Sequence, residues 1–259
     1  MRVVAVYNLK GGVGKTSTAV NLAYLASRDG VRTLLWDLDP QGAATYLFRV
    51  KARVKGGGRA LVRGRHTVDD AIKGTDFEGL DLMPADFTYR NLDLDLDAAR
   101  RPTGRLGRLL APLGGEYDLV VLDCPPSASL VSENVLRASD LLLVPLVPAV
   151  LSLRTLDQVC AFVAATRGPR SELLAFLSMV DRRKKAHRDL ADRLPGENPA
   201  VSRVSVPNLA VVEQMAEHRA PVPVYAPLSP ATRAYRDLWA EVLAHGTGQR
   251  RARHQGLPA

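Results

Sequence analysis

The sequence predicts an α/β fold in which a mostly parallel, doubly wound sheet is flanked by helices on both faces. Short apolar segments recur along the chain, and stretches with helical spacing separate most of them. Strands that are apolar on both sides are typical of a parallel sheet buried between two layers of helices. The expected strands lie at residues 2–8, 31–39, 79–85, 117–126, 139–148 and 172–180.

Composition predicts one soluble domain over residues 1–245, followed by a flexible basic tail over residues 246–259. The chain has 259 residues, of which 46% are hydrophobic and 24% charged, which is the balance of a globular protein. No apolar run is long enough to cross a bilayer, and the first residues lack a signal peptide, so we expect a cytoplasmic protein. Cys124 and Cys160 lie in apolar surroundings without metal-ligand spacing, which predicts two buried free thiols, no disulfide and no zinc.

The formal net charge of +8 is concentrated in three places. Residues 49–66 read as a flexible basic surface insertion, because seven Lys and Arg residues and no acid surround three consecutive glycines there. Residues 182–188 hold five basic side chains, and residues 250–253 hold three. A basic cluster is often only a solvated surface, but this asymmetry favours a polyanionic partner.

The first strand leads into a glycine-rich loop and then a helix that ends near Gly30. A glycine-rich loop between a strand and a helix binds phosphate through its backbone N–H groups. In "KGGVGKTS" we expect Lys15 to reach the β- and γ-phosphates of a nucleotide, and the hydroxyl of Thr16 to bind Mg²⁺. The strict motif has glycine where this chain has Leu9, so a glycine turn without a ligand stays an alternative. The predicted phosphate-binding residues are Lys10, Gly11, Gly12, Val13, Gly14, Lys15, Thr16 and Ser17.

Three aspartates follow predicted strands at the sheet edge where α/β proteins bind ligands. Asp123 ends an apolar strand and is suited to hold Mg²⁺ through water. Asp37 and Asp39 precede a Pro–Gln–Gly turn, where Asp39 could orient or deprotonate the attacking water and Asp37 could contribute to the metal shell. Strand-end aspartates also serve as turn formers and helix caps, which is the alternative for each of them.

The combination of "KGGVGKTST", "DLDPQG", "DLVVLDCPPS" and "MVDRR" resembles the ParA-type partition ATPases of the deviant Walker A class, which also contains the MinD proteins. The likeness runs over most of residues 2–243 and implies a P-loop NTPase fold, with ATP and Mg²⁺ as cofactors. It makes Lys15 the Walker lysine, Asp39 the residue that positions the hydrolytic water, and Asp123 the metal aspartate. Lys10 becomes the signature lysine, which in this family reaches the partner subunit's nucleotide. The resemblance places three residues at the adenine: Met179, Asp181 and Pro207.

The resemblance also implies a cycle. ATP supports a sandwich homodimer that binds double-stranded DNA without sequence preference, and a ParB-type centromere-binding partner stimulates hydrolysis and release. Such a protein would be associated with the nucleoid and would move chromosome or plasmid DNA, slowly hydrolysing ATP without its partner. The basic residues that we expect at the DNA are Arg182, Arg183, Lys184, Lys185 and Arg188, followed by Arg203, Arg219 and Arg233.

Four other functions share parts of this pattern. A nucleoid-bound ATPase that positions a protein cargo would carry the same motifs. A MinD-like membrane-bound division regulator would need a C-terminal amphipathic helix, and the last residues have only one large apolar side chain, Leu257. A non-hydrolysing ATP-dependent DNA-binding regulator would not need Asp39. An iron–sulfur ATPase would need bridging cysteines, for which Cys124 and Cys160 are not arranged.

Overall fold

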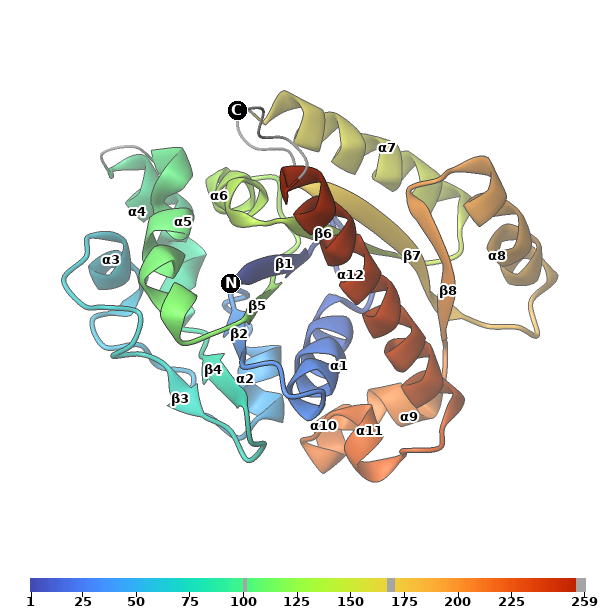
Figure 1. The fold of residues 1–259 in the computed structure, drawn as a ribbon, viewed down its shortest axis with the longest axis horizontal. Coiled ribbons are helices and arrows are strands. Elements are labelled where there is room, and N and C mark those ends of the chain that lie inside the picture. Colours follow the sequence, from blue (N-terminus) through green and yellow to red (C-terminus); the bar gives the residue numbers. More distant parts are fainter. Residues whose placement is uncertain (100–101, 167–170, 255–259) are drawn as a thin grey trace.

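The computed structural model describes residues 1–99, 102–166 and 171–254. Its centre is an eight-stranded sheet with the strand order β3-β4-β2-β5-β1-β6-β7-β8 (Figure 1). All pairs are parallel except β3 with β4. The strands are β1 (Arg2–Val6), β2 (Thr33–Asp37), β3 (Lys73–Gly74), β4 (Leu80–Met83), β5 (Leu119–Asp123), β6 (Leu141–Leu146), β7 (Glu172–Val180) and β8 (Val201–Pro207).

Helices cover both faces of the sheet. They are α1 (Lys15–Arg28), α2 (Ala43–Leu47), α3 (Gly57–Val62), α4 (Leu92–Asp97), α5 (Arg105–Leu110), α6 (Leu130–Ala138), α7 (Val150–Ala165), α8 (Lys185–Glu197), α9 (Ala210–Glu213), α10 (Met215–His218), α11 (Val222–Tyr225) and α12 (Pro230–His254). Three short 3₁₀ helices are η1 (Phe87–Asn91), η2 (Pro102–Gly104) and η3 (Ala111–Gly115). Among the residues that the structure describes, none of these helices combines the length and apolar character of a bilayer span.

The side chains of β1 show how the sheet divides the core. Successive residues of a strand point to opposite faces. Val4 and Val6 join the apolar cluster under α1 and α12, whereas Val3 and Ala5 join the cluster under α5, α6 and α7. Figure 1 shows α12 running beside α1 over the first of these faces. Burial on both faces is the physical reason for the continuous apolar strands in the sequence.

The doubly wound α/β prediction is confirmed, and all six expected strands are present. Two strands were not predicted from the sequence: β8 and the two-residue β3. β8 escaped because its sequence, "VSRVSVP", is interrupted by serines and an arginine, as suits an edge strand that is covered less completely. Helix α12 extends to His254, into the range 246–259 in which a flexible tail was expected, and residues 255–259 lie outside the described residues.

The basic insertion at residues 49–66 is not an open, flexible loop. Its seven Lys and Arg side chains are exposed, but four of the apolar residues between them are buried: Val54, Ala60, Leu61 and Val62. Val54 and Leu61 belong to the larger core cluster, and Val62 packs with Leu92 and Leu96 of α4. The backbone N–H of Val54 also donates to the Asp86 carboxylate at 2.8 Å. The segment therefore presents a basic surface from an ordered position.

The two cysteines differ from each other. Cys124 is buried at the end of β5, where burial raises the pKa of its thiol well above the ordinary value. Cys160 is exposed on α7, so the expectation that both thiols are buried is wrong for this residue. The helical repeat accounts for the error, since Cys160 follows the fully buried Val159 and points away from the face that packs on the sheet.

Candidate functional site

The glycine-rich loop connects the end of β1 at Val6 to the start of α1 at Lys15. Gly12 and Gly14 have φ angles of 69° and 90°, in the left-handed region that side chains with a Cβ rarely adopt. Gly14 also lies against β7, because a Cβ there would be 2.8 Å from the hydroxyl of Ser178. Glycine at this position thus allows the loop to turn directly into the helix.

Asn8 fixes the beginning of the loop, and its side chain is almost completely buried. Its amide nitrogen donates to the carbonyl of Pro145 on β6 at 2.7 Å, and its side-chain oxygen accepts from the N–H of Lys10 at 2.9 Å. Asn8 therefore attaches the loop to a neighbouring strand.

The two lysines of the loop lie in different surroundings. Lys15 is buried, and its ammonium donates to the carbonyl of Lys10 at 2.8 Å. Burial lowers the pKa of Lys15, while the nearby Asp123 opposes that effect. Lys10 is exposed, and its ammonium reaches the carbonyl of Leu151 on α7 at 3.4 Å. Lys15 is thus enclosed by its own loop, whereas the side chain of Lys10 extends from the loop towards α7.

Asp123 is fully buried at the end of β5, and neither carboxylate oxygen has a hydrogen-bond partner among the described residues. In the sheet register it pairs with Val6, where the loop begins, and with Asp37. Burial, and then the charge of Asp37, raise the pKa of the Asp123 carboxyl well above its ordinary value, and the nearby Thr16 hydroxyl and Lys15 ammonium oppose this shift only in part. A buried carboxylate without a partner is costly, so this geometry suits a carboxylate that receives a cation or its bound water.

Asp37 is also fully buried, but its oxygens are engaged. One accepts from both the N–H and the hydroxyl of Thr45, at 2.8 and 2.7 Å, and the other accepts from the N–H of Asp39 at 3.2 Å. Burial raises the pKa of Asp37 to about 6 in spite of these bonds. Asp37 therefore holds two segments against the sheet: the turn that begins at Asp39 and the helix α2 after it.

Asp39 is partly exposed at the start of that turn. Its carboxylate accepts from the N–H of Gln41 at 2.9 Å, and its carbonyl accepts from the N–H of Gly42 at the same distance. The charge of Asp39 acts on both Lys15 and Asp123, which places this carboxylate near the glycine-rich loop.

The donor set at this edge fits Mg²⁺ bound together with phosphate. No group of three or more His, Cys, Asp or Glu side chains in the described residues could enclose a metal ion by itself. Mg²⁺ usually keeps several waters and takes one or two protein oxygens plus substrate phosphates. The Thr16 hydroxyl at the start of α1 and the unpartnered oxygens of Asp123 are oxygen donors of that kind.

The expected adenine residues fall in two adjoining cavities. Met179 and Pro207 line a small cavity with Gly14 and Ser17 of the loop. Asp181 lines a larger cavity, which Pro207 also borders. A hydrogen bond from the Arg183 guanidinium lowers the pKa of Asp181 to about 2. Residues that the sequence analysis missed also line the small cavity: Ser178, Val206, Asn208, Leu209, Val212, Glu213 and Tyr235. Asn208 directly follows Pro207, so it could have been identified had the strand β8 been recognised.

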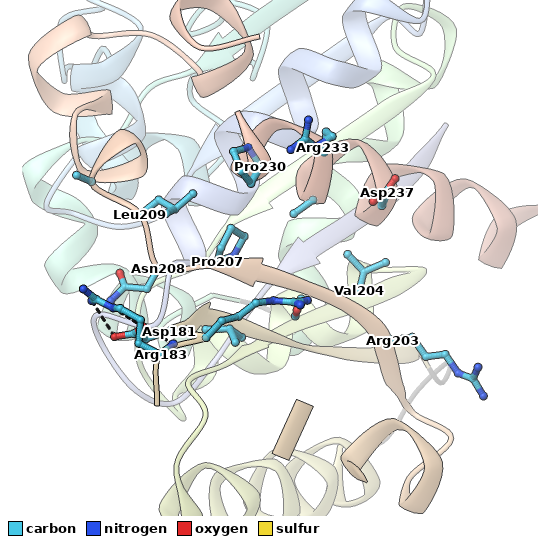
Figure 2. Close-up of a pocket in the computed structure, with 15 residues that line it drawn as sticks. Asp181, Arg183, Arg203, Val204, Pro207, Asn208, Leu209, Pro230, Arg233 and Asp237 are labelled. Carbon is cyan, nitrogen blue, oxygen red and sulfur yellow. Dashed lines mark hydrogen bonds and ion pairs between the residues drawn. The ribbon is translucent and has the colours of Figure 1, made fainter. Parts of the chain in front are cut away.

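Four of the basic residues expected at DNA gather around the larger cavity, which has a volume of about 1040 Å³. Figure 2 shows Arg183 paired with Asp181 on one side and Arg233 of α12 on the other. The cavity is open, and three sections of the chain contribute to it: the end of β7, β8 and α12. The four residues are Arg182, Arg183, Arg203 and Arg233.

The remaining basic candidates divide between this surface and a separate one. Lys184, Lys185 and Arg188 are exposed next to Arg182 at the start of α8, and Arg188 donates to the carbonyl of Arg182 at 2.6 Å. Arg219 lies elsewhere, because its guanidinium donates to the carbonyl of Tyr46 at 2.9 and 3.0 Å and stacks on the Tyr46 ring. The structure therefore brings most of the candidates together and leaves Arg219 in a packing role beside α2.

Known proteins share this arrangement along the whole chain. Residues 1–173 match the family model described as an AAA domain. The sporulation initiation inhibitor protein Soj of Bacillus subtilis is 32% identical over 251 residues, which are 95% of this chain and 99% of that protein. The chain belongs to the ParA/MinD family of partition ATPases. The chromosome partitioning protein ParA of Caulobacter vibrioides is likewise 32% identical over 94% of each chain.

Solved structures extend the ParA/MinD comparison to the fold. Cobyrinic acid a,c-diamide synthase of Mycobacterium smegmatis, with a bound ATP analogue and magnesium, has a TM-score of 0.80 and 28% identity, covering 95% of this chain and 96% of that one. McdA of Cyanothece, solved as an ATP complex, has a TM-score of 0.83, covers 94% and 96%, and is 20% identical, so it supports the fold alone.

Proposed function

We propose that this chain is a Mg²⁺-dependent ATPase that acts as a DNA-binding switch in chromosome or plasmid partition. In its ATP state it forms a homodimer that binds double-stranded DNA without sequence preference, and hydrolysis stimulated by a ParB-type partner releases it. The observation that carries the ATPase part is Asp123, whose two buried and unpartnered oxygens lie beside the glycine-rich loop and Lys15. The chromosome-partitioning relatives support the biological role.

The loop residues bind and orient the triphosphate. The N–H groups of residues 11–16 and the ammonium of Lys15 carry the positive charge that phosphate oxygens require. Lys15 exchanges its present bond to the Lys10 carbonyl for the β- and γ-phosphates. Thr16 and Asp123 would hold Mg²⁺, directly and through water, and the ion supplies neutralisation of charge on the phosphate oxygens.

Asp39 acts on the water that attacks the γ-phosphorus. Its carboxylate, held by the N–H of Gln41, accepts a hydrogen bond from that water and takes its proton as the new P–O bond forms. The bond from the γ-phosphorus to the bridging oxygen breaks, and ADP and phosphate are the products. Since Asp37 holds α2 and this turn through Thr45, it positions the reacting carboxylate without contacting the water.

Lys10 is the residue that makes the site depend on a second subunit. The backbone N–H of Lys10 donates to Asn8, and its ammonium donates to the carbonyl of Leu151. Leu151 is itself 64% exposed. An exposed leucine beside an exposed lysine at the mouth of a nucleotide site is suited to meet another protein surface. We infer that Lys10 contacts the nucleotide of the partner subunit.

The basic surface around α8 and β8 contacts the DNA phosphates. Four exposed residues, Arg182 to Lys185, lie at the start of α8, and two of them, Arg182 and Arg183, line the large cavity together with Arg203 and Arg233. Phosphate contacts of this kind bind without reading sequence and weaken as salt increases. We infer that the protein is nucleoid-associated in its ATP state.

The test is binding to a random-sequence duplex with ATP, with ADP and without nucleotide, in the presence of Mg²⁺. We expect binding with ATP and at least about tenfold weaker binding in the other two states, because only the dimer presents two basic surfaces. Equal binding in all three states would contradict the switch. A Lys15→Ala variant serves as the control, since it should bind alike under all three conditions.

A further inference from the structure

A second cavity, of about 560 Å³, lies between α3 and the pair α4 and α5. Figure 1 shows these helices on the opposite side of the molecule from β8 and α8. The basic insertion forms one wall, so the cavity includes a charged segment to which neither the nucleotide site nor the α8 surface gives a role. The lining residues are Val62, Arg63, Asp95, Ala98, Ala99, Arg105 and Arg108.

The lining side chains carry three positive charges and one negative charge. The negative one is Asp95, which is mostly buried and lies 4.0 Å from the guanidinium of Arg59, outside the lining. Arg63 is exposed, and its guanidinium has neither an ion pair nor a hydrogen bond within the described ranges. The cavity therefore has an excess of positive charge that an anion would neutralise.

Arg105 is held in place for such an anion. Its Nε is buried and has no hydrogen-bond partner among residues 1–99, 102–166 and 171–254. Its guanidinium lies against Gly64, where a Cβ would be 2.9 Å from Nη2, and the φ of Gly64 is 69°. Burial, and then the like charge of Arg108, lower the pKa of Arg105. A buried donor without a partner next to a like charge is unfavourable in the empty cavity and becomes favourable when an anion binds.

We propose that the cavity between α3 and α5 binds a phosphate group, with Arg63 and Arg105 as its principal ligands. A phosphate monoester carries about two negative charges and three acceptor oxygens, which suits several guanidinium groups better than one carboxylate does. None of the described lining residues is aromatic, so the cavity offers no ring on which a base could stack. The ligand is recognised by its phosphate, which comes either from a small phosphorylated molecule or from the DNA backbone.

This site is separate from the proposed ATPase cycle and can be tested without hydrolysis. Calorimetry of the full chain with saturating ADP, titrated with pyrophosphate, measures anion binding while the glycine-rich loop is occupied. We expect the Arg63→Ala/Arg105→Ala variant to bind pyrophosphate at least about tenfold more weakly than the unchanged chain, because each arginine supplies charge-assisted hydrogen bonds. Arg63→Ala alone, at an exposed position, should show part of the loss without affecting folding.

The matched control is Arg53→Ala, which removes one exposed charge from the same segment but does not line the cavity. It should bind pyrophosphate within about twofold of the unchanged chain, because screened surface charges contribute little. A loss in Arg63→Ala equal to that in Arg53→Ala would show general charge attraction and would overturn the proposal.

Binding of the ATP-loaded variants to a short duplex identifies the source of the phosphate. If the backbone supplies it, the Arg63→Ala/Arg105→Ala variant also loses DNA affinity and its salt slope falls by about one unit per lost contact. If a small molecule supplies it, only pyrophosphate binding changes. Unchanged binding of both pyrophosphate and DNA would overturn the site, whereas DNA binding that ignores nucleotide state would contradict the proposed function and leave the pyrophosphate result standing.

Discussion

The centre of the sheet and its two ends place functional groups in different ways. At the centre, the parallel register puts the end of β5 beside the ends of β1 and β2, so Asp123 is buried next to the glycine-rich loop. At the ends, the basic residues of 49–66 and 182–188 are exposed on short helices and turns. Backbone hydrogen bonds between strands thus fix the positions of the proposed nucleotide-binding residues, whereas the basic surfaces are distinguished mainly by their charge.

The largest expected effect comes from changing Lys15. Lys15→Ala removes a buried ammonium that donates to the Lys10 carbonyl in the nucleotide-free chain, so the phosphates lose a charge-assisted contact. We expect at least about 100-fold weaker ATP binding in calorimetry. ATP affinity within about threefold of the unchanged chain would show that the loop is only a turn.

Asp39→Ala should separate binding from hydrolysis. The variant keeps the loop and Lys15 but loses the carboxylate that accepts the water proton, so we expect kcat to fall by roughly 10²–10³. ATP binding should persist, and the DNA-bound dimer should accumulate. The measurement is phosphate release together with DNA retention after ATP addition. Normal phosphate release would remove Asp39 from the reaction.

The two ends of the sheet can be compared directly by removing four charges from each. One variant should bind DNA several-fold or more weakly and with a flatter salt slope: the one in which Arg182, Arg183, Lys184 and Lys185 are all changed to Ala. The matched variant changes Lys51, Arg53, Lys55 and Arg65, which are equally exposed, and should have the smaller effect. ATP-driven dimerisation should be normal in both. The reverse order would place the main DNA surface on the insertion.

The smallest expected effect concerns stability at the centre of the sheet. In the nucleotide-free protein at pH 8, Asp123→Asn removes a buried charge that has no partner among the described residues, which should stabilise by about 2 kcal/mol, or roughly 4–8 °C in Tm. Because burial raises the folded-state pKa of Asp123, protonation relieves the cost as pH falls through that pKa, and the gain should shrink towards acid pH.

Asp118→Asn is the control for this thermal measurement. The hydrogen bond from Arg32 lowers the pKa of Asp118 to about 2, so its charged form is favoured in the folded protein and its removal should not raise Tm. If Asp123→Asn also left Tm unchanged at pH 8, the buried carboxylate would have to be compensated within the folded chain, contrary to the geometry described above.

Sequence reasoning located the central site because its signals are local. A strand, three glycines, Lys15 and Thr16 are contiguous, and Asp123 closes an apolar run, so the sheet-edge rule for α/β folds brings them together without further information. The same rule could not tell Asp37 from Asp123. Only the bonds from Thr45 show that one carboxylate braces the turn while the other is left without a partner.

The sequence was less informative where packing between distant segments decides the outcome. The insertion looked flexible because of its charges and glycines, but Val54 and Leu61 are buried in one cluster with Tyr89 of η1, which comes much later in the chain. Arg219 was expected at DNA from its charge alone, and nothing in the sequence indicated that its guanidinium would stack on Tyr46, far earlier in the chain. Residue charge is readable from sequence, but the partner that neutralises it is not.

The central claim is that a second subunit completes the nucleotide site through Lys10. Sedimentation velocity with ATP and Mg²⁺ should show a dimer for Asp39→Ala and a monomer for the Lys10→Ala/Asp39→Ala double variant. In calorimetry, the double variant should bind ATP within about threefold of Asp39→Ala, because the contact made by Lys10 belongs to the partner's site. A nucleotide-induced dimer that forms equally well without the Lys10 side chain would contradict this account.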